Sequence, residues 1–338
     1  KIEYLNDSKR HKILSITTVS FDIFAFETLM SLTRGLTVYL TNENEQKITS
    51  KIEKIIKRNK IEIMQTTPSV MKFHLENLNN KESLKSLKYI ILAGEPLPKT
   101  LVDKIKAIIP GIQVFNGYGP SETTIFSTFA NVTEQKEITI GKPINNTQIY
   151  ILNKHKKLMP QGTIGELYIS SDNLFVEYLN NPDETNKIKV IDELEKQWVK
   201  SGDLCYIDKD GYIIPRGRNR RLIRKEAFKI SPDTIEEVIS SIPFVQDCVV
   251  VGVDDEKSLS VPMAFIVLKD ETLSFDEVKE QIKEKCVEEL PDYEVPTYFE
   301  QIDKIPYTPN DKQDFRTLEN IGNEIVKNQK SKKLVKKI

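Results

Sequence analysis

The residues best suited to bind a nucleotide lie in one segment, residues 116–124, which reads NGYGPSETT. The aromatic face of Tyr118 can stack on a base, and the amide of Asn116 offers both a donor and an acceptor. The hydroxyl of Ser121 can reach a phosphate, and Glu122 is a hard oxygen ligand of the kind that Mg²⁺ prefers. The segment is equally consistent with an ordinary strand-to-loop turn, in which two glycines supply unusual backbone angles.

Two more polar segments could contribute to the same chemistry. Residues 201–204 read SGDL and place Asp203 after what reads as a tight turn, where its carboxylate could bridge two neighbouring ribose hydroxyls. Alone, this residue is more simply a β-turn aspartate. Lys312 follows a Tyr-Thr-Pro turn, and a single loop lysine is usually solvated surface. No segment by itself identifies a nucleotide site, so the interpretation depends on the order of the segments along the chain.

The composition excludes several classes of protein. The 338 residues include 49 Lys+Arg and 50 Asp+Glu, and a net charge of −1 gives no electrostatic case for nucleic acid or a membrane surface as the partner. No apolar stretch is long enough to span a membrane, and no signal peptide opens the chain. The 13 glycines form neither GxGxxG nor GxxxxGK[ST], which argues against a dinucleotide fold or a Walker ATPase. Three widely spaced cysteines favour a reducing cytoplasm.

Alternating patterns predict a parallel sheet with crossover helices over residues 13–125. Strands are predicted at 37–40, 61–64, 89–92 and 113–115, and helices at 22–32, 48–56, 68–77 and 101–109. In the first helix Phe21, Phe24, Ala25, Leu29 and Leu32 are near helical spacing. Since ligands gather at the carboxyl ends of parallel strands, the loops at 65–69, 93–98 and 116–124 are the predicted binding region.

The rest of the chain predicts two smaller units. Residues 126–217 contain short strands at 148–151, 166–169 and 212–214, which indicate a small β-barrel subdomain. Residues 218–320 predict a small, mobile α+β C-terminal domain, and residues 321–338, rich in lysine, predict a tail or linker. The fold class is therefore α/β, with residues 1–217 forming a parallel-sheet subdomain and a β-barrel subdomain ahead of the C-terminal domain.

Nine segments follow one another in an order that resembles a known family. They are Phe21-Asp22, Ala93–Leu97, Asn116–Thr124, Gly141–Tyr150, Gly165–Leu167, Ser201–Leu204, Gly217-Arg218, Leu290–Pro296 and Asn310–Asp314. The family motifs that they resemble are FDxS, AGE, NxYGPTE, IGxPIxNTxxY, GEL, TGDL, GR, LPxYMVP and NGKxD. These belong to the amino-acid-activating adenylation domains of nonribosomal peptide synthetases, within the adenylate-forming enzymes. The resemblance covers the chain from Ile13 to about Leu318.

The resemblance implies a reaction and a set of site residues. An amino acid is activated with ATP and Mg²⁺ as an aminoacyl adenylate, pyrophosphate leaves, and the acyl group passes to a phosphopantetheine thiol on a carrier protein, beside condensation domains. The implied roles are catalysis for Lys312, nucleotide binding for Gly94, Glu95, Asn116, Tyr118, Ser121, Asp203 and Arg218, Mg²⁺ binding for Glu122, and the hinge for Arg220.

By the same resemblance Asp22 faces the α-ammonium group of the substrate. A buried carboxylate requires a cationic partner, which favours an amino acid over a fatty or aryl acid. Without the resemblance, Asp22 is read as a helix N-cap. The implied pocket walls are Ile23, Phe26, Gln65, Ile91, Ala93, Gly117, Ile125 and Phe126. Because only Gln65 among these walls is polar, we expect a neutral, small to medium aliphatic amino acid.

The chain also departs from the family pattern. Nothing in residues 1–20 replaces the family's phosphate loop, so we expect an N-terminal portion to be missing and the chain alone to react poorly. Arg220 stands where the family has an aspartate, and the loop at 224–236 lacks two glycines. Two alternatives therefore stay open. One is a free-standing acyl- or aryl-CoA ligase, and the other is a non-catalytic remnant that binds nucleotide or a partner domain.

Overall fold

The computed structural model describes residues 11–192, 195–218, 221–225, 228–255, 259–270, 272–307 and 313–335. The chain forms two compact units. The first comprises Lys1–Ser201 and Cys205–Pro215, and the second comprises Gly202–Leu204 and Arg216–Ile338. In the described part of the chain, no helix is both long and apolar enough to cross a membrane.

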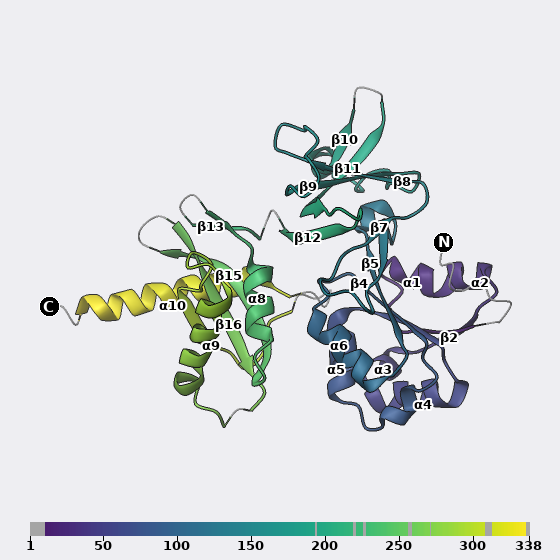
Figure 1. Ribbon diagram of the computed structural model, residues 1–338, viewed down its shortest axis with the longest axis horizontal. Helices are drawn as coiled ribbons and strands as arrows, with labels where there is room; N and C mark the ends of the chain where they lie inside the picture. Colours follow the sequence, from purple (N-terminus) through teal and green to yellow (C-terminus); the bar gives the residue numbers. More distant parts are fainter. Residues whose placement is uncertain are drawn as a thin grey trace. The chain divides into compact units, whose positions relative to one another are not determined.

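The first unit is built on a seven-stranded sheet with the order β2-β1-β3-β4-β5-β6-β7 (Figure 1). Its strands are β1 (Lys12–Ser15), β2 (Thr37–Leu40), β3 (Ile63–Thr66), β4 (Tyr89–Ala93), β5 (Gln113–Tyr118), β6 (Thr128–Asn131) and β7 (Lys142–Pro143). Strands β1 to β5 pair in parallel, and β6 runs antiparallel to β5. The predicted parallel sheet is confirmed, and the four-residue strand β1 is an addition to it.

Residues that alternate along the central strands divide the sheet into two apolar faces. One face carries Leu14, Met64, Ile90, Leu92 and Val114, and three amphipathic helices cover it (Figure 1). These helices are α4 (Thr49–Asn59), α5 (Pro68–Glu76) and α6 (Lys99–Ile108). The short α3 (Glu43–Gln46) precedes α4, and η3 (Lys81–Leu84) follows α5. The other face carries Ile13, Ile63, Ile91 and Phe115.

A continuous helical segment, residues 23–33, packs on this second face. It consists of α1 (Ile23–Ala25), the π-helical turn η2 (Phe26–Met30) and α2 (Ser31–Thr33). The predicted helix is confirmed, but its buried face does not carry all the residues that the apolar spacing predicted. Leu29 and Leu32 are 66% and 58% exposed, whereas the polar Glu27 and Thr28 are buried. The π-helical turn shifts the phase of the helix, so a regular 3.6-residue period does not describe it.

The remaining part of the first unit is a smaller sheet with the strand order β10-β11-β9-β8, to which β12 adds by pairing with β11. Its elements are β8 (Thr147–Leu152), β9 (Gly165–Ser171), α7 (Pro182–Ile188), β10 (Lys189–Ile191), β11 (Gln197–Ile207) and β12 (Ile213–Arg218). Its core contains Ile151, Leu167, Ile169, Cys205 and Ile213.

The second unit contains a three-stranded sheet with helices on both faces. Its elements are β13 (Ile223–Lys225), β14 (Phe228–Ile230), α8 (Pro232–Ser240), β15 (Val245–Asp255), β16 (Leu259–Leu268), α9 (Phe275–Glu289), β17 (Tyr298–Gln301) and α10 (Phe315–Val335). Apolar residues of α8 and α9 pack on one face of β15 and β16, and α10 packs on the other face. This is the α+β arrangement that the sequence predicted.

The long helix α10 corrects the interpretation of residues 321–338 as a tail or linker. Residues 321–335 continue the helix that starts at Phe315. Leu318 and Val326 are buried against the sheet of their unit. A side chain at Gly322 would meet Val253 and Met263 within 3.0 Å, so the helix lies very close to β15 and β16. The apolar spacing of 318, 322 and 326 is the signal that the lysine content obscured.

Candidate functional site

Four of the implied pocket residues lie on three neighbouring strands of the large sheet. Gln65 on β3 is in register with Ile91 on β4, and Ala93 on β4 is in register with Gly117 on β5. Ile91 and Ala93 are two residues apart, so they lie on the same face of β4. This is the face that the 23–33 helical segment covers, near the carboxyl ends of the parallel strands.

The other pocket residues come from that helical segment and from the loop after β5. Ile23, Phe26, Ile125 and Phe126 pack in one apolar cluster with Ile91. The rings of Phe26 and Phe126 are edge to face with centroids 5.2 Å apart. The structure therefore brings the pocket walls together, although they are spread over more than one hundred residues of sequence.

Gly117 lies very close to Phe126, another of the implied pocket residues. A Cβ atom placed there would lie 2.6 Å from the Phe126 ring, a distance at which the ring has to move. Neighbouring Gly119 is tight as well, because its Cβ would lie 2.5 Å from the backbone oxygen of Ile125. Both glycines allow the 125–126 backbone to fold back over β5.

The loop between Gly119 and Phe126 has unusual backbone angles. Thr124 and Ile125 both have positive φ angles, 60° and 66°. This region is rarely occupied by β-branched residues, and such outliers persist where the surrounding structure holds them. The carboxylate of Asp22 contributes here, since its Oδ2 accepts a hydrogen bond from the backbone N–H of Ile125 at 3.3 Å.

Asp22 occupies the N-cap position of α1, but its side chain does not cap the helix. Asp22 has helical backbone angles, and its side chain accepts no hydrogen bond from the first turn of the helix. The carboxylate is half-buried. Among the residues that the structure describes, no lysine, arginine or histidine forms an ion pair with it. A half-buried carboxylate beside an apolar cluster can hold an ammonium group.

The predicted nucleotide residues lie at the ends of β4 and β5. Asn116 is buried, and its amide donates to the backbone carbonyl of Thr139 at 2.9 Å. Tyr118 is half-buried, and the side chain of Ser121 is exposed on the short turn η4 (Ser121–Thr123). One of the two amide N–H groups of Asn116 is therefore engaged inside the protein.

Gly94 and Glu95 follow β4 directly. The φ angle of Gly94 is 86°, in the left-handed region that favours glycine. The carboxylate of Glu95 accepts hydrogen bonds from the backbone N–H (2.9 Å) and the hydroxyl (2.6 Å) of Ser69. Ser69 lies in the first turn of α5, so Glu95 neutralises the positive end of that helix and fixes the turn that Gly94 begins.

Glu122 is the predicted Mg²⁺ ligand, and a tyrosine orients it. The hydroxyl of Tyr178 donates to its Oε1, and its backbone carbonyl accepts from the N–H of Phe175 at 2.8 Å. Within the described residues no group of three His, Cys, Asp or Glu side chains gathers as a metal site. A single oriented carboxylate nevertheless fits Mg²⁺, which proteins often hold through one or two carboxylates together with phosphates and water.

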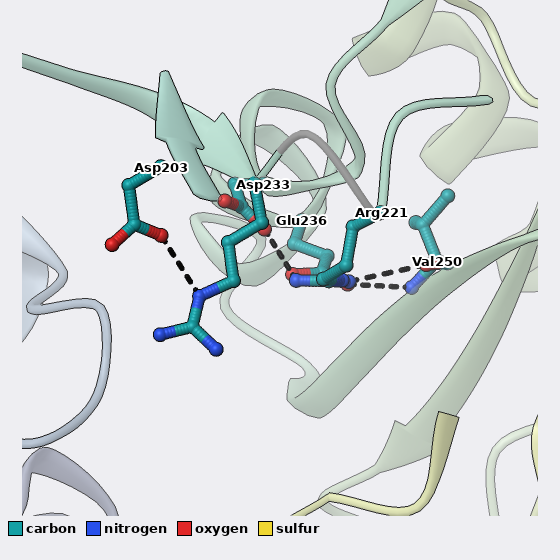
Figure 2. A network of polar contacts seen from close by, with 6 residues as sticks. Asp203, Arg221, Asp233, Glu236 and Val250 are labelled. Atoms are coloured by element: carbon teal, nitrogen blue, oxygen red, sulfur yellow. Dashed lines mark hydrogen bonds and ion pairs between the residues drawn. The ribbon is translucent and has the colours of Figure 1, made fainter. Parts of the chain in front are cut away.

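Asp203 and Arg218 form an ion pair in the second unit, with Arg218 Nε 2.9 Å from Asp203 Oδ1. Figure 2 labels Asp203 of this pair. The Asp203 side chain is 10% exposed, and that of Arg218 is 66% exposed. The interpretation of Asp203 as a turn residue is corrected, because it lies within the strand β11. Gly202, with φ of 79°, bends the strand at this point and explains the turn-like sequence.

Two further predicted residues, the catalytic Lys312 and the hinge residue Arg220, lie outside the described residues. The next residue after the hinge position, Arg221, is described, and it forms a cluster that the sequence did not predict (Figure 2). Its guanidinium group donates to Asp233 and, at 2.5 Å, to Glu236. Glu236 also accepts from the backbone N–H of Val250 at 2.7 Å. Burial raises the pKa of Glu236, and the adjacent Arg221 charge opposes that shift.

A second buried carboxyl group, Glu27, was also missed. It lies in η2 and contacts the hydroxyls of Ser15 and Thr17. Burial raises the pKa of Glu27, and hydrogen bonds from Thr17 and Ser15 oppose that shift. The only signal in the sequence is an acidic residue inside an apolar run, and without the π-helical turn that run places the acid on the outer face.

Comparison with models of protein families gives two matches. Residues 2–179, more than half of the chain, match the model described as AMP-binding enzyme. Residues 234–312 match the model described as AMP-binding enzyme C-terminal domain.

Curated relatives include peptide synthetases. Gramicidin S synthase 2 from Brevibacillus brevis is 32% identical over 329 residues, which cover 94% of this chain and 7% of the synthase. The dimodular nonribosomal peptide synthase from Bacillus subtilis (strain 168) is 31% identical over 312 residues, which cover 91% of this chain and 13% of that protein. The chain thus spans a small part of the length of these relatives.

Solved structures share the fold. A four-domain nonribosomal peptide synthetase bound to AMP and glycine has a TM-score of 0.80 at 28% identity, over 93% of this chain and 23% of that one. An anthranilate CoA ligase in complex with anthranoyl-AMP has a TM-score of 0.82 at 23% identity, over 93% of this chain and 60% of the ligase. These similarities confirm the predicted fold class.

Proposed function

This chain belongs to the AMP-binding enzymes, as its motifs predicted, and from that premise we propose that it activates the carboxyl group of an amino acid with ATP. A carboxylate oxygen attacks the α-phosphorus, the bond between the α-phosphorus and the bridging oxygen breaks, and pyrophosphate leaves with the electron pair. The product is an aminoacyl adenylate. The acyl group then passes to the phosphopantetheine thiol of a carrier protein, in an assembly line with condensation domains, and AMP is released.

The observation that carries this proposal is the carboxylate of Asp22. It is half-buried beside the apolar cluster that contains Ile125, and the part of the chain that the structure describes gives it a backbone N–H but no cationic side chain. A carboxylate in such a place is stabilised by a cation, and the α-ammonium group of an amino acid supplies one. A fatty or aryl acid has no group that pairs with it.

The pocket walls define the proposed substrate further. Apart from Asp22 they are apolar or small, except for the amide of Gln65. A charged side chain would lose its hydration there without gaining an ion pair. The proposed substrate is therefore a neutral amino acid of small to medium size, with an aliphatic side chain as the first choice.

The nucleotide has its own set of proposed contacts. The ring of Tyr118 and the amide oxygen of Asn116 receive adenine, and the exposed hydroxyl of Ser121 receives the α-phosphate. Gly94 and Glu95 shape the adjoining turn. The Asp203–Arg218 pair holds the ribose, since a carboxylate can accept hydrogen bonds from two vicinal hydroxyls.

Charge on the phosphates is the main barrier to the reaction. Mg²⁺, held by Glu122, would neutralise negative charge on the phosphate oxygens. Lys312 is the proposed source of the positive charge that stabilises the transition state, and Arg220 is the proposed hinge of the mobile unit that carries it. The family resemblance supports both roles, and the lysine lies in the segment 310–314 that matches its motif.

The proposed compartment is the cytoplasm. All three cysteines, Cys205, Cys248 and Cys286, are buried, and none forms a disulfide. This usage fits a reducing environment. The balanced net charge of −1 gives no reason to expect nucleic acid or a membrane surface as a partner.

The test is ATP–pyrophosphate exchange with a panel of amino acids, measured on the complete polypeptide that contains these residues. We expect exchange with one or a few neutral amino acids, and its loss in Lys312→Ala. A matched control is Lys85→Ala, on the exposed surface of the first unit. Exchange only with other carboxylic acids would identify an acyl- or aryl-CoA ligase. Binding of nucleotide without any exchange would identify a non-catalytic protein.

A further inference from the structure

A carboxyl group without a cationic partner lies directly behind the proposed pocket. Glu27 follows the pocket residue Phe26 and is 0% exposed. Its Oε2 accepts hydrogen bonds from the hydroxyl of Ser15 at 2.7 Å and from the backbone N–H of Thr17 at 3.1 Å. Its Oε1 lies 2.6 Å from the hydroxyl oxygen of Thr17. Over the described ranges of the chain, its partners are hydroxyl and amide groups and none is a cation.

Thr17 connects this carboxyl group to the polar residue of the pocket. Its hydroxyl oxygen lies 3.3 Å from Oε1 of Gln65. The Gln65 amide nitrogen donates to the backbone carbonyl of Thr66, also at 3.3 Å. Gln65 is two residues after Ile63 on β3, so it lies on the sheet face that carries the pocket. The three side chains form a row from Glu27 through Thr17 to Gln65.

The row contains too few protons to satisfy all of its oxygen atoms when Glu27 is ionised. The Thr17 hydroxyl has one proton, yet it lies between two oxygen atoms that both accept hydrogen bonds when Glu27 is ionised. Reversing the Gln65 amide would bring its oxygen against the Thr66 carbonyl. The row is fully satisfied when Oε1 of Glu27 carries a proton and donates to Thr17, which then donates to Gln65. Oε2 remains the acceptor for Ser15 and for the Thr17 backbone, in agreement with its two donors.

We propose that Glu27 is a neutral carboxylic acid that, through the hydroxyl of Thr17, positions the amide of Gln65 in the substrate pocket. Glu27 and Thr17 are thus positioning residues, and Gln65 is the residue that meets the substrate side chain. The proposal rests on the proposed function, because it assigns Gln65 to the amino-acid pocket. It deepens that function by explaining why the pocket selects a neutral side chain.

The surroundings of Glu27 support a neutral group. The elements packed against η2 are β1 with the residues that follow it, α1 and α2, and they face Glu27 with Ser15, Thr17 and the backbone amide of Ile16. Neither α1 nor α2 contains a titratable side chain. The main influences on the pKa of Glu27 are burial and hydrogen bonds from Thr17, Ser15 and Ile16. Burial raises the pKa of Glu27, which is the direction that a neutral acid requires.

The charge of Glu27 decides between two substrate classes. An ionised carboxylate one layer behind the pocket would attract a cationic side chain long enough to reach it. A neutral acid gives no such attraction, and a cationic side chain would lose hydration without compensation. The proposal therefore excludes basic amino acids as the best substrates and assigns a neutral one.

Infrared difference spectroscopy tests the protonation state directly. The spectrum of the complete polypeptide at neutral pH, minus that of Glu27→Gln, should contain the C=O band of a protonated carboxyl group. A difference spectrum that contains carboxylate bands instead would overturn the proposal. This readout needs no substrate, so it stays decisive if no amino acid is activated and the proposed function itself fails.

Exchange kinetics test the positioning role. Glu27→Gln keeps a neutral donor, so we expect kcat/KM for the preferred amino acid to change by less than about threefold. Thr17→Val removes the connecting hydroxyl, and we expect KM for the amino acid to rise about tenfold with a smaller change in kcat. The control is Thr18→Val, next along the chain, whose hydroxyl contacts the exposed Ser20 and which should match the wild type.

Two kinetic results would contradict the proposal. One is a preference of the wild type for a basic amino acid that Glu27→Gln abolishes, because the carboxylate would then be an ionised ligand. The other is a Thr17→Val variant with an unchanged KM, because Gln65 would then hold its position without the row. Melting temperatures of both variants, compared with that of Thr18→Val, separate a loss of folding from a loss of positioning.

Discussion

One fully buried and one mostly buried carboxyl group in this protein are accommodated in opposite ways. Glu27, in the first unit, is surrounded by hydroxyl and amide groups. Glu236, in the second unit, lies against the guanidinium group of Arg221 and also accepts from the backbone of Val250. Burial raises the pKa of both acids, but only the second has a cation that opposes the shift.

The difference shows what each region requires. A charge pair in a low-dielectric region has a fixed geometry, and removing one partner destabilises the fold because the other charge is left uncompensated. In the second unit the pair fixes the start of α8 and the strand β15 to the residue that follows the proposed hinge. A neutral acid holds a pocket in place without adding a field that would select a charged substrate. The ion pair of Glu236 with Arg221 thus holds elements of the second unit together, whereas the neutral Glu27 serves substrate recognition.

Breaking the ion-pair cluster should have the largest effect. Arg221→Ala leaves Asp233 and Glu236 without their cation, and we expect it to destabilise the second unit by about 3 kcal/mol, since the lone partners of a buried pair are costly. The side chain of Arg221 is only 14% exposed, and its guanidinium also lies 4.1 Å from the ring of Phe315. Urea unfolding measures the loss.

The matched control for this variant is Lys85→Ala. It removes an ion pair with Glu82 in which both side chains are mostly exposed. Such pairs contribute about 0 to 1 kcal/mol. Equal effects of the two variants would contradict the view that the Arg221 cluster differs from an ordinary surface pair.

Asp22 extends the comparison to a carboxylate that is proposed to bind the substrate. Asp22→Asn preserves the shape of the side chain but removes the charge that would hold the α-ammonium group. We expect kcat/KM in pyrophosphate exchange to fall about 100-fold, because charge-assisted hydrogen bonds contribute about 1.5–3 kcal/mol. Asp103→Asn, on the exposed surface of α6, is the control and should exchange normally. A wild-type rate in Asp22→Asn would remove the main support for an amino-acid substrate.

Much of the first unit could be predicted because its signals are local. Four apolar runs separated by helical patterns predict β2 to β5, and the 116–124 segment marks the loop after the last of them. Strand β1 was missed because KILS is four residues long and follows a polar segment. The pocket walls could be named only through the family resemblance, since register between strands brings Gln65 beside Ile91 and no local pattern encodes it.

The residues that were missed depend on contacts between distant segments or on local irregularity. Glu27 is buried because a π-helical turn rotates it inward, a change that no regular period predicts. Asp203 reads as a turn because of Gly202, although strand pairing continues through it. Arg221 lies in a basic stretch that looks like solvated surface. Its acids, at 233 and 236, belong to a helix that only the fold of the second unit places beside it.

The pH dependence of stability should distinguish the two kinds of buried acid. The pKa of Glu27 is raised in the folded protein, so its favourable contribution is fully present below the unfolded pKa of 4.5 and is lost as pH rises through the folded pKa. We therefore expect the stability of Glu27→Gln, relative to the wild type, to increase as pH rises from about 4 to 8. Denaturation at several pH values measures this. A relative stability that is flat or falls with pH would show that Glu27 is ionised in the fold.

The smallest expected effect concerns Glu122, a half-buried carboxylate that a neutral hydroxyl orients, as in the case of Glu27, but that is proposed to bind a metal. Tyr178→Phe removes the hydroxyl that donates to Glu122 Oε1 and leaves the ring in place. A single hydrogen bond contributes about 1 kcal/mol, so we expect the Mg²⁺ concentration for half-maximal exchange to rise about fivefold with little change in stability. Tyr150→Phe is the control, because Tyr150 is 43% exposed and its ring stacks on that of Trp198. If Tyr178→Phe lowered the exchange rate equally at all Mg²⁺ concentrations, the phenol would act on the fold of the loop and not on the carboxylate that it contacts.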